Sequence, residues 1–124
     1  MDKLTLSSLG HTWIIDLDGT IVKHNGYKLD GEDSFLEGAK AFLDSIPTED
    51  FILFLTSRTD EYRDITITFL QKNKVRYNHI IFNAPYGERI IVNDNKPSGL
   101  AMSLSLGVKR DTPIFPVIDI DRSL

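Results

Sequence analysis

Apolar residues recur along the chain in short continuous runs that end at polar turns. Four such runs occupy residues 12–15, 51–55, 79–82 and 89–92. A run without polar alternation is typical of a strand that is buried on both faces of a parallel sheet. A weaker run at residues 114–118 includes Pro116 and follows Pro113, which favours an edge strand because proline cannot donate to a ladder.

Between these runs, apolar residues recur at helical spacing. The spacing predicts helices at residues 35–46, from about 62 to 70, and at 98–106. Pro47 ends the first helix and Gly107 closes the third. Residues 21–34 show no sustained periodicity, and they are interpreted as a loop or flap.

Alternating strands and helices predict one α/β domain over residues 1–124, a three-layer Rossmann-like fold with a mainly parallel central sheet. Only about forty residues separate the first two strand ends, and they already hold a helix, so we expect no cap domain. One connection does not fit this architecture easily. Six residues, 83–88, join the third and fourth runs, whereas a parallel crossover usually takes a dozen or more. Either this crossover is unusually tight or one run is not a full sheet member.

Polar side chains follow three of the predicted strands where each ends. Asp16 and Asp18 follow the first, Thr56 the second and Asp94 the fourth. The carboxyl ends of parallel strands meet at one edge of a sheet, where ligands bind. Carboxylates gathered there repel one another, and Mg²⁺, which prefers oxygen ligands, relieves the repulsion and leaves room for a phosphate oxygen.

The segment Asp16-Leu17-Asp18-Gly19-Thr20, after an apolar strand, resembles the first motif of the haloacid dehalogenase superfamily. Thr56 resembles the second motif and Asp94 the metal-binding acid of the fourth, so the resemblance covers residues 12 to about 96. Residues 87–97 also resemble compact members that are linked to bacterial surface-polysaccharide and nucleotide-sugar pathways.

The resemblance implies a two-step phosphoryl transfer. Asp16 attacks phosphorus and forms an aspartyl-phosphate, while Asp18 protonates the leaving oxygen and then activates water. Thr56 is expected to bind a phosphate oxygen. Mg²⁺ is the implied cofactor, held by Asp16, Asp94 and the backbone carbonyl of Asp18. The expected substrate-binding residues in the two turns are Gly19, Thr20, Ser57 and Arg58.

The lysine of the family's third motif is missing. Ala84 stands before Pro85, where compact relatives often carry that lysine. Lys72 is the first candidate to replace it by its spacing from Asp94, and the alternatives are Lys74, Arg89 and Lys96.

Simpler interpretations of the same residues exist. The aspartate motif and Asp94 are also typical of solvated turns, and Ser57 or Thr59 is typical of a helix N-cap. The three histidines lack a metal-ligand spacing, although His24 lies in the flap region, from which it could touch a substrate.

Composition narrows the function classes. A formal net charge of −4 disfavours non-specific binding to nucleic acid, and the absence of cysteine excludes disulfides and thiolate sites. The N-terminal residues do not resemble a signal peptide, and no apolar stretch is long enough for a membrane span, so a cytoplasmic location is expected.

The sequence therefore predicts a Mg²⁺-dependent phosphomonoester hydrolase. Its expected partner is a small phosphate ester, most simply a sugar phosphate, in a site that a second copy in a homo-oligomer helps to close. Three alternatives stay open: a receiver-like signalling module, a catalytically silent family member acting as a partner subunit, and a phosphatase of nucleic-acid 3′-phosphates.

Overall fold

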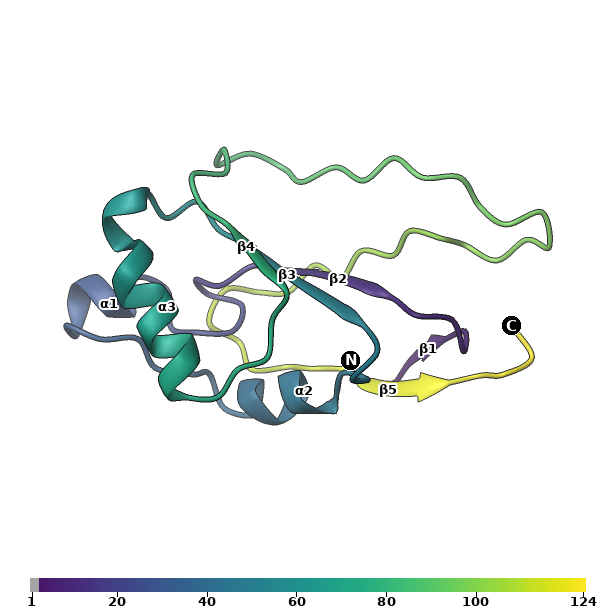
Figure 1. The fold of residues 1–124 in the computed structure, drawn as a ribbon, viewed down its shortest axis with the longest axis horizontal. Helices are drawn as coiled ribbons and strands as arrows, with labels where there is room; N and C mark the ends of the chain where they lie inside the picture. Colours follow the sequence, from purple (N-terminus) through teal and green to yellow (C-terminus); the bar gives the residue numbers. More distant parts are fainter. Residues whose placement is uncertain (1–2) are drawn as a thin grey trace.

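The computed structural model describes residues 3–124, and it has the predicted α/β architecture with parallel strands and no cap domain (Figure 1). The strands are β1 (Lys3–Leu6), β2 (Thr12–Ile15), β3 (Phe51–Leu55), β4 (His79–Ile81) and β5 (Val117–Ile120). Strands β2, β3 and β4 form one parallel sheet in that order. Strands β1 and β5 pair in parallel as a separate two-stranded sheet.

The helices are α1 (Gly26–Leu29), α2 (Ala39–Ser45) and α3 (Arg63–Lys72), with a 3₁₀ turn, η1 (Asp60–Tyr62), before α3. The predicted helix at residues 35–46 is thus shorter than expected. Gly38, with φ of 81°, precedes its first residue, and only glycine adopts that conformation readily. The flap at residues 21–34 contains α1, which the sequence pattern did not predict.

One face of the β2-β3-β4 sheet carries the hydrophobic core. Ile15 of β2 lies beside the fully buried Phe54 of β3, and this face packs against Leu43 of α2 and Leu70 of α3. The other face is more open, because Ile14 and Phe51 are both 44% exposed. Within residues 3–124, helices α2 and α3 both pack on the core face of the sheet.

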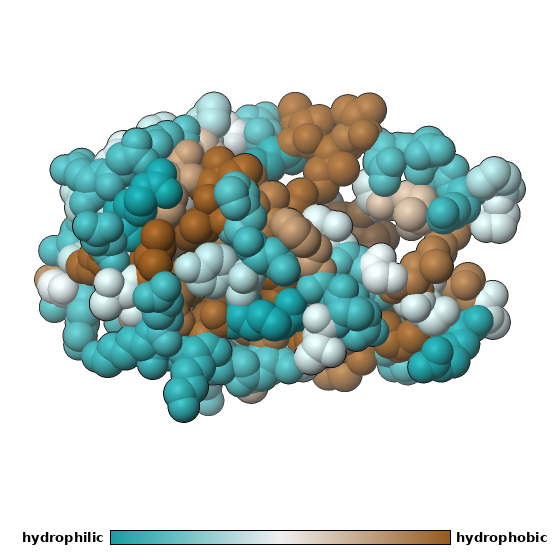
Figure 2. All heavy atoms as spheres, viewed as in Figure 1, coloured by the Kyte–Doolittle hydropathy of each residue, from teal (hydrophilic) through white to brown (hydrophobic). Residues whose placement is uncertain are grey.

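Residues 83–116, called the long segment below, leave the end of β4, run to one end of the molecule and return to β5 (Figure 1). The predicted strand at 89–92 and helix at 98–106 were wrong, since neither forms. The six-residue connection after the third run is too short for an ordinary crossover, so the chain leaves the sheet instead. Gly99, with φ of 98°, interrupts the predicted helix. Apolar side chains of this segment reach the surface (Figure 2).

The two-stranded sheet was only partly predicted. Strand β5 begins at Val117 rather than 114, directly after Pro116, which has no N–H for a ladder. Strand β1 was missed, because four residues give too short a pattern to recognise. Across residues 3–124, no helix is long and apolar enough to cross a membrane.

A buried carboxylate fixes the amino end of the sheet. Asp50 accepts hydrogen bonds from Trp13 Nε1 at 2.9 Å and from the backbone N–H of His11 at 3.0 Å. His11 Nδ1 lies 2.8 Å from the same carboxylate, and its Nε2 lies 3.0 Å from the Ser7 carbonyl. Both ring nitrogens face acceptors, so both bonds form only when the imidazole carries both protons. Burial raises the pKa of Asp50, but the bonds from Trp13 and His11 outweigh it and hold the pKa below the ordinary 3.8.

Asp50→Asn is expected to lower the free energy of unfolding at pH 7 by about 2 kcal/mol, because it removes hydrogen bonds to a buried charge. Because the pKa of Asp50 is lower in the folded than in the unfolded protein, its ionised carboxylate stabilises the fold at pH values above the unfolded pKa. This stabilisation is lost as the pH falls through the folded pKa. The difference in free energy of unfolding between wild type and Asp50→Asn should therefore become smaller below about pH 4. Urea unfolding at pH 7, 5 and 3 measures this difference. The control is Asp44→Asn, at a carboxylate that is 59% exposed. A difference that stays constant down to pH 3 would contradict this assignment.

Candidate active site

The aspartate motif forms a tight turn at the carboxyl end of β2. The Leu17 carbonyl accepts hydrogen bonds from the N–H groups of Thr20, Ile21 and Val22 at 3.2, 3.0 and 3.1 Å. Leu17 itself is buried in the core, so the alternation of side chains turns Asp16 and Asp18 away from it. Gly19 has a φ of 79°, which lets the chain leave the strand sharply.

Asp16 is accessible and held in place at both carboxylate oxygens. Its Oδ2 accepts a hydrogen bond from Thr20 Oγ1 at 3.0 Å, and its Oδ1 accepts one from Arg89 Nη1 at 3.0 Å. The side chains of Asp16 and Arg89 are each 34% exposed. Asp16 therefore offers an oriented carboxylate to a ligand from solvent, beside a positive charge.

The cation beside Asp16 is Arg89, not Lys72. Arg89 comes from the long segment and also lies 3.5 Å from Ser57 Oγ. Lys72 is in the last turn of α3, which starts near the end of β3 and runs back along the sheet. The chain just after that helix reaches the start of β3, where the Asn78 N–H bonds the Ile52 carbonyl at 2.8 Å. The ranking of Lys72 first was wrong, because spacing in sequence did not show at which edge of the sheet the residue lies.

Arg58 is buried and uses all five of its N–H donors. Nε and Nη2 bind the two oxygens of Asp18 at 2.9 and 3.0 Å. Nη1 and Nη2 bind the two oxygens of Asp33 at 2.9 and 2.7 Å, and Nη1 also binds Thr66 Oγ1 at 2.8 Å. No donor remains for a phosphate. The expectation that Arg58 binds substrate is thus corrected, and its role is to orient Asp18.

The charges in this cluster favour a stable guanidinium. Burial lowers the pKa of Arg58, but its bonds to Asp33 and Asp18 outweigh burial and hold the pKa above its ordinary value. The Tyr27 ring lies 3.9 Å from the guanidinium carbon. Burial and the nearby Asp18 charge raise the pKa of Tyr27 above 10.0, so its phenol stays neutral near pH 7.

Asp18 keeps one position free for a proton. Its Oδ1 accepts bonds from Arg58 and from the Asn25 N–H at 3.3 Å, whereas Oδ2 accepts only the bond from Arg58 within residues 3–124. Two carboxylates, Asp18 and Asp33, share one guanidinium, so the cluster has one net negative charge.

Thr56 and Ser57 lie where the sequence predicted, at the end of β3. Thr56 is almost fully buried, and its Oγ1 accepts a hydrogen bond from the Arg58 N–H at 3.1 Å. The Thr56 carbonyl accepts a bond from the Ala84 N–H at 3.0 Å, which fastens the turn after β4 to this strand end. Ser57 Oγ donates to the Pro85 carbonyl at 3.3 Å. Strand β3 thus brings Thr56 and Arg58 to the same edge as Asp16.

Residues 110 and 111 cover the other side of the motif, and the sequence did not predict them. A Cβ on Gly19 would lie 2.9 Å from Arg110 Cγ, so the Arg110 side chain rests directly on this glycine. The Gly19 carbonyl accepts a bond from the Asp111 N–H at 2.9 Å, and Asp111 Oδ1 accepts one from the His24 N–H at 2.8 Å. His24 Nδ1 is buried without a hydrogen-bond partner among the described residues.

The predicted metal ligands do not come together. Asp16 and Asp18 are neighbours, each paired with an arginine, whereas Asp94 is on the long segment and is exposed. Over residues 3–124, no group of three or more His, Cys, Asp or Glu side chains is arranged to hold a metal ion. This donor set does not fit the predicted magnesium site.

Sequence reasoning also missed Asp33, which is buried against Arg58. Its position in the polar 21–34 stretch gave no sign of burial. A signal was present in Arg58, because an arginine directly after a buried strand end requires acidic partners if it too is buried.

No protein-family model and no curated protein matches the chain. Among solved structures, a chain of "Structure of Pnkp1/Rnl/Hen1 complex" is similar, with a TM-score of 0.52 and 25% sequence identity. The match covers 67% of this chain and 31% of that chain, so this chain spans about a third of that neighbour. The likeness agrees with the Rossmann-like α/β fold that the strands show.

Proposed function

We propose that this chain hydrolyses phosphomonoesters through an aspartyl-phosphate on Asp16. The observation that carries the proposal is the carboxylate pair itself. Asp16 is exposed and fixed by Thr20 and Arg89, and Asp18, two residues on, is fixed by Arg58 with one oxygen position free. One carboxylate is thus available for attack and the other for proton transfer.

In the first step, a carboxylate oxygen of Asp16 bonds to phosphorus as the bond to the ester oxygen breaks. The departing oxygen takes a proton from Oδ2 of Asp18. In the second step, water gives a proton to Asp18 and its oxygen bonds to phosphorus, which breaks the bond to Asp16 and releases phosphate. Asp18 ends in its starting protonation state, so the cycle closes.

Arg89 supplies the positive charge that the missing lysine would have given. Its guanidinium already contacts Asp16, and from there it can bind the oxygens of a phosphate as their charge develops. The backbone N–H groups of Gly19 and Thr20 are already bonded to the carbonyls of Val22 and Leu17, so Arg89 is the donor that this proposal relies on.

Arg89→Ala is expected to lower kcat/KM for phosphate release by about a hundredfold, the usual loss when one charge-stabilising donor is removed. Lys72→Ala is the matched control, and it should stay within about twofold of wild type because Lys72 lies at the far edge of the sheet. A larger loss from Lys72→Ala than from Arg89→Ala would contradict the assignment.

Dependence on magnesium is proposed from the resemblance to the haloacid dehalogenase motifs. When bound, the ion would offset charge on the transferred phosphoryl group. No step above passes through it, because the donor set is incomplete as the residues are placed. Activity that survives exhaustive EDTA treatment unchanged would argue against the cofactor and leave the roles of Asp16 and Asp18 intact.

The sugar-phosphate substrate, the surface-polysaccharide pathway and closure by a second copy also remain proposals. A nucleic-acid 3′-phosphate is the alternative substrate, although the net charge of −4 disfavours it.

The test is phosphate release from sugar phosphates, nucleotides, alkyl phosphates and 3′-phosphorylated oligonucleotides, with and without Mg²⁺. Asp16→Asn, prepared in parallel, serves as the blank. With a covalent intermediate, the share of phosphoryl groups transferred to an added alcohol should be the same for every substrate, because all form the same aspartyl-phosphate. If no substrate is turned over above the blank, the enzyme proposal is wrong, and phosphate binding without turnover would indicate the silent alternative.

A further inference from the structure

A large cavity adjoins Asp16 along the free edge of β2. Its volume is about 910 Å³, and the consecutive residues 12–16 all line it. The opposite walls come from β1 and from residues 100–106 of the long segment. This size is in the range of pockets that bind small organic ligands.

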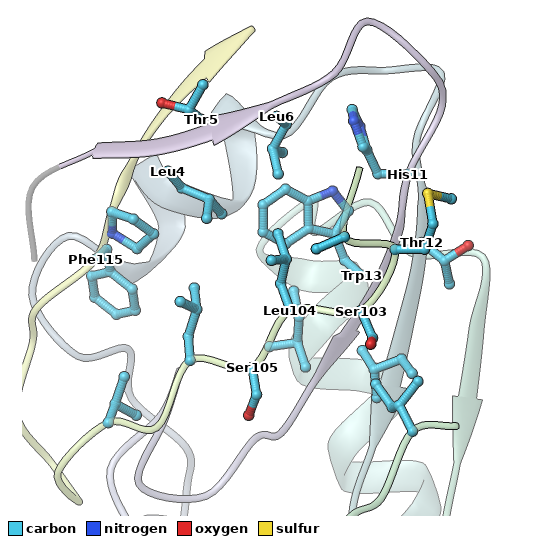
Figure 3. Close-up of a pocket in the computed structure, with 18 of the residues that line it drawn as sticks. Leu4, Thr5, Leu6, His11, Thr12, Trp13, Ser103, Leu104, Ser105 and Phe115 are labelled. Atoms are coloured by element: carbon cyan, nitrogen blue, oxygen red, sulfur yellow. The ribbon is translucent and has the colours of Figure 1, made fainter. Parts of the chain in front are cut away.

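The cavity has a charged end, and the rest of its lining is mostly apolar, with polar side chains interspersed at Thr5, Ser7, His11, Thr12, Asn93, Ser103 and Ser105. Asp16, Thr20 and Arg89 line it at the proposed phosphate site. Elsewhere, the side chains of Leu4, Leu6, Trp13, Leu104 and Phe115 surround the same hollow (Figure 3). Several lining residues are exposed, such as Ile14 at 44% and Leu104 at 52%.

We infer that the cavity binds the apolar part of the substrate, so that the substrate is an amphiphilic phosphomonoester with an alkyl or aryl group. This inference rests on the proposed function and replaces a bare sugar as the expected organic group. A phosphate bound at Asp16 and Arg89 would place its ester group in the same cavity. Burying that group against the apolar side chains, which make up most of the lining, is favourable.

The chain's own strand-like residues 89–92 are a poor alternative occupant. If residues 89–92 paired in parallel with the free edge of β2 and ended level with Asp16, residue 89 would lie near Thr12. Residue 89 instead lies at the other end, where Arg89 bonds Asp16 at 3.0 Å. The pairing and this ion pair exclude each other, so the cavity stays available to a ligand while Arg89 is in place.

Trp13 provides a direct readout, because it is the single tryptophan and lines the cavity. The experiment titrates the full chain with octylphosphonate and methylphosphonate, whose carbon–phosphorus bond resists hydrolysis, and with octanol. Octylphosphonate should change the Trp13 emission and bind at least about a hundredfold more tightly than methylphosphonate, since each buried CH₂ contributes about fourfold. Leu104→Asp should remove this advantage. Val92→Asp should not, because Val92 is 94% exposed and outside the lining.

The outcomes separate the two proposals. Equal binding of both phosphonates overturns the apolar subsite and leaves the phosphate site standing. If neither phosphonate binds, the phosphate site fails and the inference falls with it. Octanol binding as tightly as octylphosphonate would show a cavity that is not coupled to phosphate, which also overturns the inference. Hydrogen-exchange protection of residues 89–92 would also overturn the inference, because this segment would then fill the cavity. A dimer seen in sedimentation, with no change in Trp13 emission on adding ligand, would overturn it too, because a second copy of the chain would then fill the cavity.

Discussion

Replacing Asp16 by Asn should lower kcat for phosphate release by at least about a thousandfold, because an amide oxygen cannot form the aspartyl-phosphate. The loss should come with little change in stability. The Asp16–Arg89 ion pair is one-third exposed at both partners, and such pairs contribute at most about 1 kcal/mol. Asn also keeps an oxygen for the bond from Thr20. Phosphate release and thermal unfolding, measured on the same preparation, separate these effects.

A second variant tests whether Asp16 is the nucleophile and Asp18 the group that transfers the proton. Asp18→Asn should also reduce turnover, but a substrate with a good leaving group, such as p-nitrophenyl phosphate, should recover part of the first step because it needs no proton. The same substrate should not rescue Asp16→Asn. Activity of Asp16→Asn within tenfold of wild type would refute the nucleophile assignment.

Arg58→Leu should be the most destabilising single substitution in the site, by about 3–5 kcal/mol, because it leaves the carboxylates of Asp18 and Asp33 without their cation. The uncompensated charge of Asp33 should account for more of the lost stability than that of Asp18, because the Asp33 side chain is only 2% exposed and the Asp18 side chain is 17% exposed. Urea unfolding at pH 7 measures the loss. Arg63→Leu is the control, since the Arg63–Asp60 pair is exposed and its loss should cost less than about 1 kcal/mol.

The double variant Arg58→Leu with Asp33→Leu distinguishes a lost ion pair from lost packing. Removing both members of a buried pair is often close to neutral, so the double variant should recover a large part of the stability. It should not recover activity, because Asp18 would no longer be oriented. If the double variant is less stable than Arg58→Leu alone, the uncompensated charge of Asp33 is not the cause of the loss.

The predictable parts of this fold are those in which a local pattern and the tertiary structure agree. The run Phe51–Leu55 predicts a strand correctly, because five consecutive apolar residues are difficult to place elsewhere. The same reasoning brought Asp16 and Thr56 together, since both follow parallel neighbours at the same edge. The resemblance of the motif then suggested chemistry that strand placement alone does not give.

The predictions that were wrong depended on the position of segments that are distant in the sequence. Residues 89–92 have the apolar run of a strand, but pairing needs a partner edge that the chain can reach, and no local pattern encodes that reach. Spacing along the sequence favours Lys72 over Arg89 for the same reason. The sequence predicts that Arg58 binds substrate, because arginine commonly binds phosphate. In the structure Asp33 binds Arg58 instead, because the fold of the flap brings the two residues close.

The pairing of β1 with β5 bears on the order in which the chain folds. Thr5 and Asp119, which meet across this small sheet at 3.5 Å, are 114 positions apart in the sequence. Closing so long a loop has a high entropic cost and is repaid by only four residue pairs, Lys3↔Val117 to Leu6↔Ile120. The β2-β3-β4 sheet with its helices forms from nearer neighbours, so it should assemble first and β1–β5 should close last. The wall that β1 gives to the cavity would then be the final part of the binding site to form.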